Sequence, residues 1–132
     1  MRRIPFMAIA LILGSSAMLA AQAPRPPGST RTDLQRHDLS IPGWETIQAR
    51  VDFAPGANFP AHRHPGEEII YVLEGILEYQ LEGQPPKTLM AGDVLYVPAR
   101  VIHSARNVGT TQGSELATYV VEKGKPLTEF AE

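Results

Sequence analysis

The sequence predicts an all-β fold, a sandwich or barrel of short strands, and three observations support this. Between Asp33 and Glu122 no apolar pattern recurs at helical spacing. Short runs of β-branched, aromatic and aliphatic residues follow one another instead, and segments containing Gly and Pro interrupt them. Turns as frequent as these are typical of β-sandwiches and β-barrels.

The expected strands follow in chain order. In TIQARVDF (46–53) apolar residues alternate with polar ones, as a half-buried strand requires. ILEYQLEG (76–83) shows the same alternation and runs into the turn EGQPPK. Three further runs follow, separated by turn segments: VLYV (94–97), VIHSARNV (101–108) and ELATYVVE (115–122).

The first 23 residues predict a secretory signal peptide. Arg2 and Arg3 precede an uncharged run with the apolar centre FMAIALIL, and small residues follow it. We therefore expect residues 1–23 to be removed on export, with the mature chain beginning near Gln22 or Pro24, and the protein to be periplasmic or secreted. An uncleaved membrane anchor is the alternative, because the run approaches the roughly 20 apolar residues that span a bilayer.

The rest of the chain is expected to divide into a proline-rich linker (24–32), a barrel domain (33–122) and a loose tail (123–132). Without the two arginines at its start, the chain has ten Lys and Arg against fourteen Asp and Glu, and no basic cluster. Nucleic acid is therefore not an expected partner. The chain contains no cysteine, so neither disulfides nor a lipid-modified cysteine is expected, and no membrane attachment should remain after signal cleavage.

Polar residues with metal-binding chemistry gather in GANFPAHRHPGEEIIYVLEG (56–75). On a strand, His62 and His64 would project to one side and Arg63 to the other. Glu68 keeps the parity of the two histidines, although parity is weaker across the Pro-Gly turn between them. This pattern predicts a two-histidine clamp with a carboxylate beside it.

A third histidine, His103, lies in a later strand and would complete the set if that strand neighbours the first. Three neutral imidazoles and one carboxylate suit one divalent transition metal such as Mn, Fe, Co, Ni, Cu or Zn, and the lack of thiolates argues against a soft-metal site. The alternative is that these histidines are solvated surface residues, since a His-x-His pair also occurs by chance.

The spacing of these residues resembles the two sequence motifs of small single-domain cupins. The first motif, GX5HXHX3EX6G, is met at each fixed position by Gly56, His62, His64, Glu68 and Gly75. The second motif, GX5PXGX2HX3N, is met by Gly92, Pro98, His103 and Asn107. Arg100 stands where the second motif has its other glycine. The resemblance covers roughly residues 47–121.

The resemblance implies a double-stranded β-helix barrel of jelly-roll type, with a metal ion held inside by His62, His64, Glu68 and His103. The motif glycines are expected at turns, where a positive φ costs a glycine little. Arg100 is either a solvated turn residue or a residue that reaches the barrel mouth and holds an anionic substrate. Asn107 is left out of the ligand set, because a structural role is at least as consistent with its position.

Four protein ligands would leave one or two metal positions open, as catalysis requires. The leading hypothesis is a metal-dependent, dioxygenase-like enzyme acting on a small oxygen-rich molecule. Isomerase or lyase chemistry is the second choice of reaction. The alternative of another class is a non-catalytic protein that binds or senses a small ligand through its metal. The catalytic residues are unknown, because parity places the two candidate acids, Glu67 and Glu74, on opposite sides of their strand.

A homodimer is also expected. Both faces of the run IIYVL (69–73) are apolar, so the outer face of this strand needs cover. A second sheet of the same chain could supply that cover instead.

Overall fold

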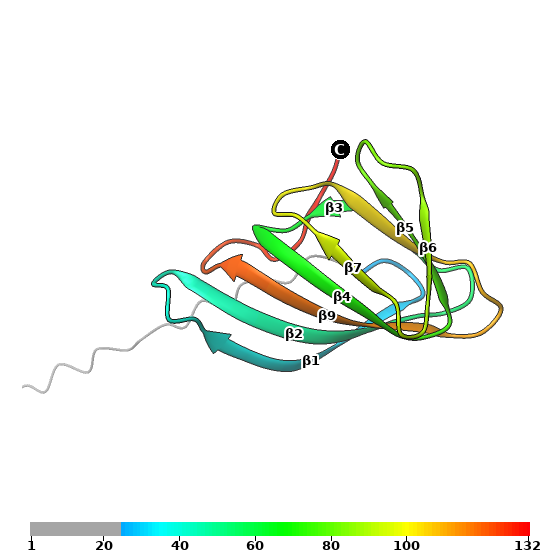
Figure 1. Ribbon diagram of the computed structural model, residues 1–132, viewed down its shortest axis with the longest axis horizontal. Helices are drawn as coiled ribbons and strands as arrows, with labels where there is room; N and C mark the ends of the chain where they lie inside the picture. Colours follow the sequence, from blue (N-terminus) through cyan, green and yellow to red (C-terminus); the bar gives the residue numbers. More distant parts are fainter. Residues whose placement is uncertain (1–24) are drawn as a thin grey trace, which may run out of the picture.

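In the computed structural model, which describes residues 25–132, the chain folds into two antiparallel five-stranded sheets stacked as layers (Figure 1). The expected all-β fold and the double-stranded β-helix architecture are confirmed. Within these residues no helix is long and apolar enough to cross a membrane. The expected signal peptide, residues 1–23, lies outside the described residues. The strands are β1 (Ser29–Asp38), β2 (Trp44–Phe53), β3 (Asn58–Arg63), β4 (Gly66–Glu74), β5 (Ile76–Leu81), β6 (Lys87–Met90), β7 (Val94–Val97), β8 (His103–Asn107), β9 (Gly113–Glu122) and β10 (Glu129–Phe130).

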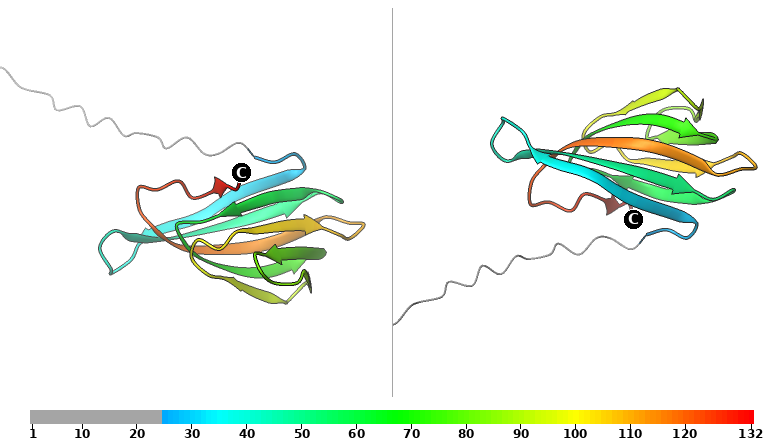
Figure 2. Two further views of the ribbon diagram at one scale, coloured as in Figure 1. Left: turned by 90° about the horizontal axis from the view of Figure 1, so that it is seen from above. Right: turned by 90° about the horizontal axis from the view of Figure 1, so that it is seen from below.

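The chain passes repeatedly between the two sheets. The first sheet has the order β1-β2-β9-β4-β7 and the second has the order β10-β3-β8-β5-β6. From β2 onward, only β5 and β6 are consecutive strands of one sheet; the other connections cross from one layer to the other (Figure 2). This crossing places strands that are distant in sequence next to each other, which is how the site residues meet.

The core lies between the layers, and the alternation seen in the sequence builds it. On β2 the inward side chains include Ile47, Ala49, Val51 and Phe53, all buried. Their partners on β9 alternate in the same way, so every second residue of both strands faces the interior. The expected strand over 46–53 is therefore confirmed and extended by two residues at its start.

The N-terminal boundary differs from the expected one. β1 begins at Ser29, inside the stretch expected as a linker, and pairs with β2 from Ser29 opposite Phe53 to Asp38 opposite Glu45. Most of its side chains are exposed, so it shows no apolar alternation. Backbone hydrogen bonds to β2, rather than burial of side chains, define this strand.

The C-terminal segment is packed where a loose tail was expected. Leu127 packs against a buried cluster that includes Ile47 and Tyr119. Two residues, Glu129 and Phe130, form β10 and pair with β3. A strand of two residues is too short to show periodicity, so no pattern in the sequence indicates it.

The turns of the motif adopt the backbone expected of them. Gly56, Gly75 and Gly92 all have positive φ. Arg100 has φ 64°, a left-handed conformation that explains why the cupin motif has glycine at this position. Its side chain lies 3.0 Å from Glu122 and is exposed, in agreement with the solvated-turn interpretation of Arg100.

Candidate metal centre

Three histidines meet because β3 and β8 are neighbours in the second sheet. His62 lies directly opposite His103 in the β3–β8 ladder, and their ring centroids are 4.2 Å apart. His64 follows the end of β3, and its ring centroid lies 4.9 Å from that of His62. One ring nitrogen from each residue falls within 4.8 Å of the others, so the buried cluster could hold a metal ion.

Glu68 approaches the histidines from the first sheet. Its Oε2 lies 3.0 Å from His103 Nε2 and 3.3 Å from His64 Nε2. The four residues predicted as ligands are thus adjacent, and all four are buried. Arg63 points outward, as strand parity predicts, and pairs with Glu129. The first position of β4 requires Gly66, because a Cβ there would lie 2.0 Å from the Val120 carbonyl oxygen.

Backbone carbonyls orient all three imidazoles. The Nδ1 atoms of His62, His64 and His103 lie 2.7, 2.6 and 3.0 Å from the carbonyl oxygens of Pro60, Leu127 and Val101, respectively. A carbonyl can only accept, so Nδ1 carries the proton in each ring. The Nε2 lone pair is then available in a neutral ring, whereas Nε2 of His103 shares a proton with Glu68, which a bound metal would displace. Histidines that ligate metals are usually held in this way.

The electrostatics of the cluster also fit a cation. Burial, together with the nearby His103 and His64, lowers the pKa of His62 to about 3, so this ring is neutral. Burial alone would raise the pKa of Glu68, but the charge of His64 and the hydrogen bond from His103 hold it well below its usual value. Burial lowers the pKa of His103, yet its bond to Glu68 outweighs this and raises it.

His64 Nε2 lacks a hydrogen-bond partner although it is buried. It lies near the Glu68 carboxylate but not in hydrogen-bond geometry. A buried polar atom of this kind costs stability unless something satisfies it. A metal ion bound at the Nε2 atoms would do so, and the set of three imidazoles and a carboxylate without sulfur suits a borderline divalent metal.

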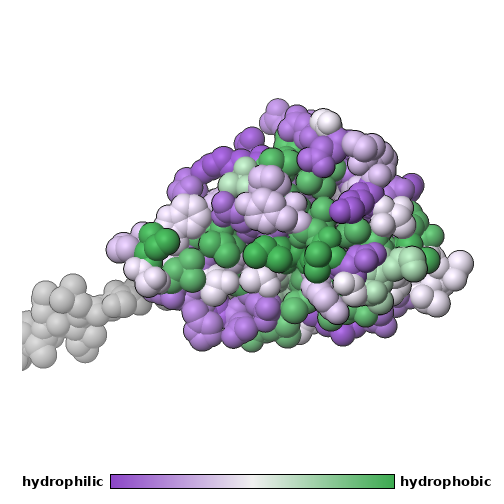
Figure 3. Space-filling model, in the orientation of Figure 1, coloured by the Kyte–Doolittle hydropathy of each residue, from purple (hydrophilic) through white to green (hydrophobic). Residues whose placement is uncertain are grey.

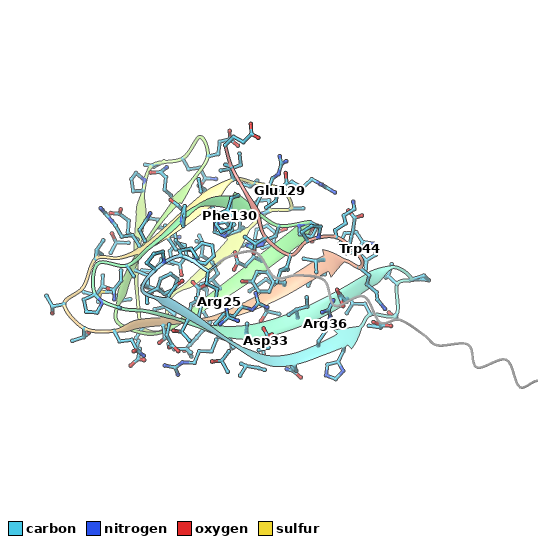
Figure 4. The ribbon with its side chains drawn as sticks, turned by 180° about the vertical axis from the view of Figure 1, so that it is seen from behind. Arg25, Asp33, Arg36, Trp44, Glu129 and Phe130 are labelled. Atoms are coloured by element: carbon cyan, nitrogen blue, oxygen red, sulfur yellow. The ribbon has the colours of Figure 1, made fainter. Side chains whose placement is uncertain are left out.

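The cluster lines a cavity of about 460 Å³ between the sheets. Residues of β1, among them Arg36, and of the C-terminal segment, among them Phe130, line this cavity (Figure 4). Arg31 lies over the ring of Tyr119 at 5.3 Å, and that ring is 4.8 Å from His64. The volume is that of a site for a small molecule.

The structure also shows which other polar residues do and do not reach the cavity. Glu67 and Glu74 do not line it, and Glu74 pairs with Arg50. Asn107 bonds the carbonyls of Phe53 and Thr111, a structural role. Sequence reasoning missed Glu115, a buried acid that lines the cavity. The sequence could have indicated Glu115, because it has the same strand parity as the inward-facing residues of β9.

Known proteins resemble this chain in both sequence and fold. Residues 49–124 match the family described as "Cupin domain". Germin-like protein 1-1 of Oryza sativa subsp. japonica is 38% identical over 88 residues, which cover 61% of this chain and 41% of that protein. Dimethylsulfoniopropionate lyase DddQ of Ruegeria pomeroyi is 38% identical over 63 residues, covering 47% of this chain and 31% of the lyase.

Two solved structures extend this similarity. An oxalate oxidase in complex with the substrate analogue glycolate superposes with a TM-score of 0.65 and 27% identity, covering 89% of this chain and 62% of that one. The crystal structure of the Ruegeria pomeroyi lyase superposes with a TM-score of 0.59 and 27% identity, covering 65% and 43%. The chain thus spans less than two thirds of the length of these relatives.

Replacing His103 with Ala should weaken metal binding by more than about tenfold, because the cluster loses one ligand and no other side chain can take its place. Isothermal titration of metal-free protein with Mn²⁺ and Zn²⁺ measures this. Arg63→Ala is the matched control: Arg63 lies beside a ligand but faces outward in an exposed ion pair, so its loss should leave affinity unchanged. Equal losses in the two variants would contradict the site.

Deleting residues 126–132 should weaken metal binding by about 10- to 100-fold, the usual effect of losing a partner that orients a ligand. The deletion removes the Leu127 carbonyl that accepts from His64 Nδ1. A chain ending at Phe130 keeps this contact and serves as the control in the same titration. If the longer deletion folds and binds metal as tightly as the full chain, the carbonyl does not orient His64.

Proposed function

Since the chain belongs to the cupin domain family, we propose that it is an exported metal-dependent enzyme acting on a small oxygen-rich molecule. The observation that carries the proposal is the convergence of three buried imidazole nitrogens at the wall of a cavity large enough for such a molecule. His62, His64, Glu68 and His103 would hold one divalent transition metal. Four protein ligands would leave room for a substrate to reach the ion directly.

A metal bound here would supply Lewis-acid or redox chemistry at the positions that the protein leaves open. The chain's own residues prepare the surroundings. Phe59 packs edge-on against His62, with the ring centroids 4.6 Å apart, and stacks on Phe130. Together with Ile70, these rings give the cavity an apolar wall that limits water near the cluster.

Oxidation with dioxygen is the reaction we propose first, supported by the similarity to oxalate oxidase. A lyase reaction is the second candidate, supported by the similarity of both sequence and structure to dimethylsulfoniopropionate lyase. Both solved structures are 27% identical to this chain, so sequence identity does not favour either reaction. The two reactions differ in whether they consume dioxygen, and a measurement of oxygen uptake can therefore distinguish them.

The test loads metal-free protein with Mn²⁺, Fe²⁺, Ni²⁺ or Zn²⁺ and follows loss of oxalate, glycolate, catechol or dimethylsulfoniopropionate together with oxygen uptake. We expect turnover that requires the metal and is abolished in His62→Ala. Oxygen uptake in step with substrate loss supports the oxidase, and substrate loss without oxygen uptake supports the lyase. Turnover by metal-free protein and by His62→Ala would refute the metal mechanism. Ligand binding without turnover would favour a binding or sensing protein.

We also propose that the protein forms a homodimer through the outer face of β4 and β7. Apolar side chains gather on this face (Figure 3). Ile69 and Tyr71 of β4 and Val94 and Tyr96 of β7 are exposed, so no layer formed by residues 25–132 covers them. We expect a dimer in sedimentation at micromolar concentration, which Tyr96→Lys should dissociate by placing a charge in the interface. Monomer alone in the unaltered protein would contradict this.

Export to the periplasm or the medium is proposed from the signal-peptide features of residues 1–23. Mass spectrometry of the protein from the native cells gives the N-terminus. An intact Met1 in the membrane fraction would instead indicate an anchor.

A further inference from the structure

A second polar pair lines the cavity that contains the histidine cluster. Tyr79 on β5 donates a hydrogen bond to Glu115 on β9, so the bond joins the two sheets across the interior. The exposed fraction is 1% for Tyr79 and 5% for Glu115. Both residues line the cavity, and neither belongs to the proposed metal ligands.

The pair lies close to the cluster. On β5, Leu81 is opposite His103, and Tyr79 is opposite Ala105, two residues further along β8. The backbone position of Tyr79 is therefore one inward position from the level of His103, about 7 Å along the sheet. Ala105, the residue opposite it, has a small side chain and lines the cavity as well. A molecule of a few carbon atoms is long enough to reach both places.

The chemistry of Glu115 leaves one hydrogen-bonding group unused. Burial, with the charge of Glu68 added, raises the pKa of Glu115 to about 8, although the bond from Tyr79 opposes this. The carboxyl group is therefore mostly protonated at neutral pH and has an O–H to donate. Within residues 25–132, Tyr79 is the one side chain hydrogen-bonded to Glu115, and it acts there as the donor.

Glu45 provides a comparison, because it is the other buried acid of the cavity wall outside the cluster. Both of its oxygens accept from Arg36, each at 2.6 Å, so its hydrogen bonds are complete within the protein. The hydrogen bonds of the Glu115 carboxyl group are not complete, because only the bond from Tyr79 is made within residues 25–132. A polar group that is buried, incompletely bonded and directed at a cavity is what recognition of a ligand oxygen requires.

We propose that Glu115 and Tyr79 form a second subsite, which binds a hydroxyl or carbonyl oxygen of the molecule held at the histidine cluster. This inference rests on the proposed function and specifies its substrate. The substrate class is a short hydroxy or keto acid whose carboxylate end binds at the metal and whose next oxygen lies two carbons beyond. A second oxygen at that distance bridges the two subsites.

The experiment compares 2-hydroxybutyrate with 2,4-dihydroxybutyrate, which differ by one hydroxyl, by calorimetry on Mn²⁺-loaded full-length protein. The added hydroxyl should tighten binding by about five- to tenfold, the gain typical of one hydrogen bond. Glu115→Leu should abolish this gain while leaving Mn²⁺ affinity and 2-hydroxybutyrate affinity unchanged. Glu115→Gln should keep most of the gain, because its amide still accepts from Tyr79 and still donates.

Three results would overturn the inference: no gain in the unaltered protein, a gain that survives Glu115→Leu, or equal losses for both probes in that variant. If Glu115→Leu does not fold, Glu115→Met, which keeps the length of the side chain but has no donor, takes its place with the same expectation. Failure of the unaltered protein to bind Mn²⁺, or to bind either probe, counts against the proposed function instead. The two failures are thus distinguishable.

Discussion

The pairing of β3 with β8 is the constraint on which the site depends. It places His62 directly opposite His103, although they are 41 positions apart in the sequence. Because β8 also pairs with β5 on its other side, the same strand sets the position of Tyr79 relative to the cluster. A shift of one residue in this register would place His62 and His103 on opposite faces of the sheet. One strand in the middle of the second sheet therefore sets the positions of His62, His103 and Tyr79 relative to one another.

The buried carboxylate and imidazoles of the cluster would destabilise the fold if they were not paired and oriented by other segments. A carboxylate buried with three imidazoles is stable only if its charge is balanced and each ring is held in one orientation. The three carbonyls that hold the rings come from separate segments: β3, the turn before β8, and the C-terminal segment. The orientation of the rings therefore depends on closure of the whole barrel, including the short β10.

Strand alternation lets the same sheets serve two purposes. Inward residues of β4 and β9 are mostly apolar but include one acid in each strand, Glu68 and Glu115, which gives a mostly apolar cavity with polar groups at defined places. Outward residues of β4, such as Ile69 and Tyr71, form the exposed apolar face. The inner face of the sheet therefore carries the groups that would bind a ligand, and the outer face carries those that would contact a second molecule, because neighbouring residues of a strand face opposite sides.

The all-β fold and the proximity of His62 and His64 could be predicted from the sequence, because strand alternation and turn glycines act over a few residues. With the motif spacing the sequence also indicated Glu68 and His103. The start of β1, the bond from His64 to the Leu127 carbonyl and the Tyr79–Glu115 pair became visible only in the folded chain. These features join segments far apart in the chain through backbone pairing and buried hydrogen bonds, which leave no period in the local sequence.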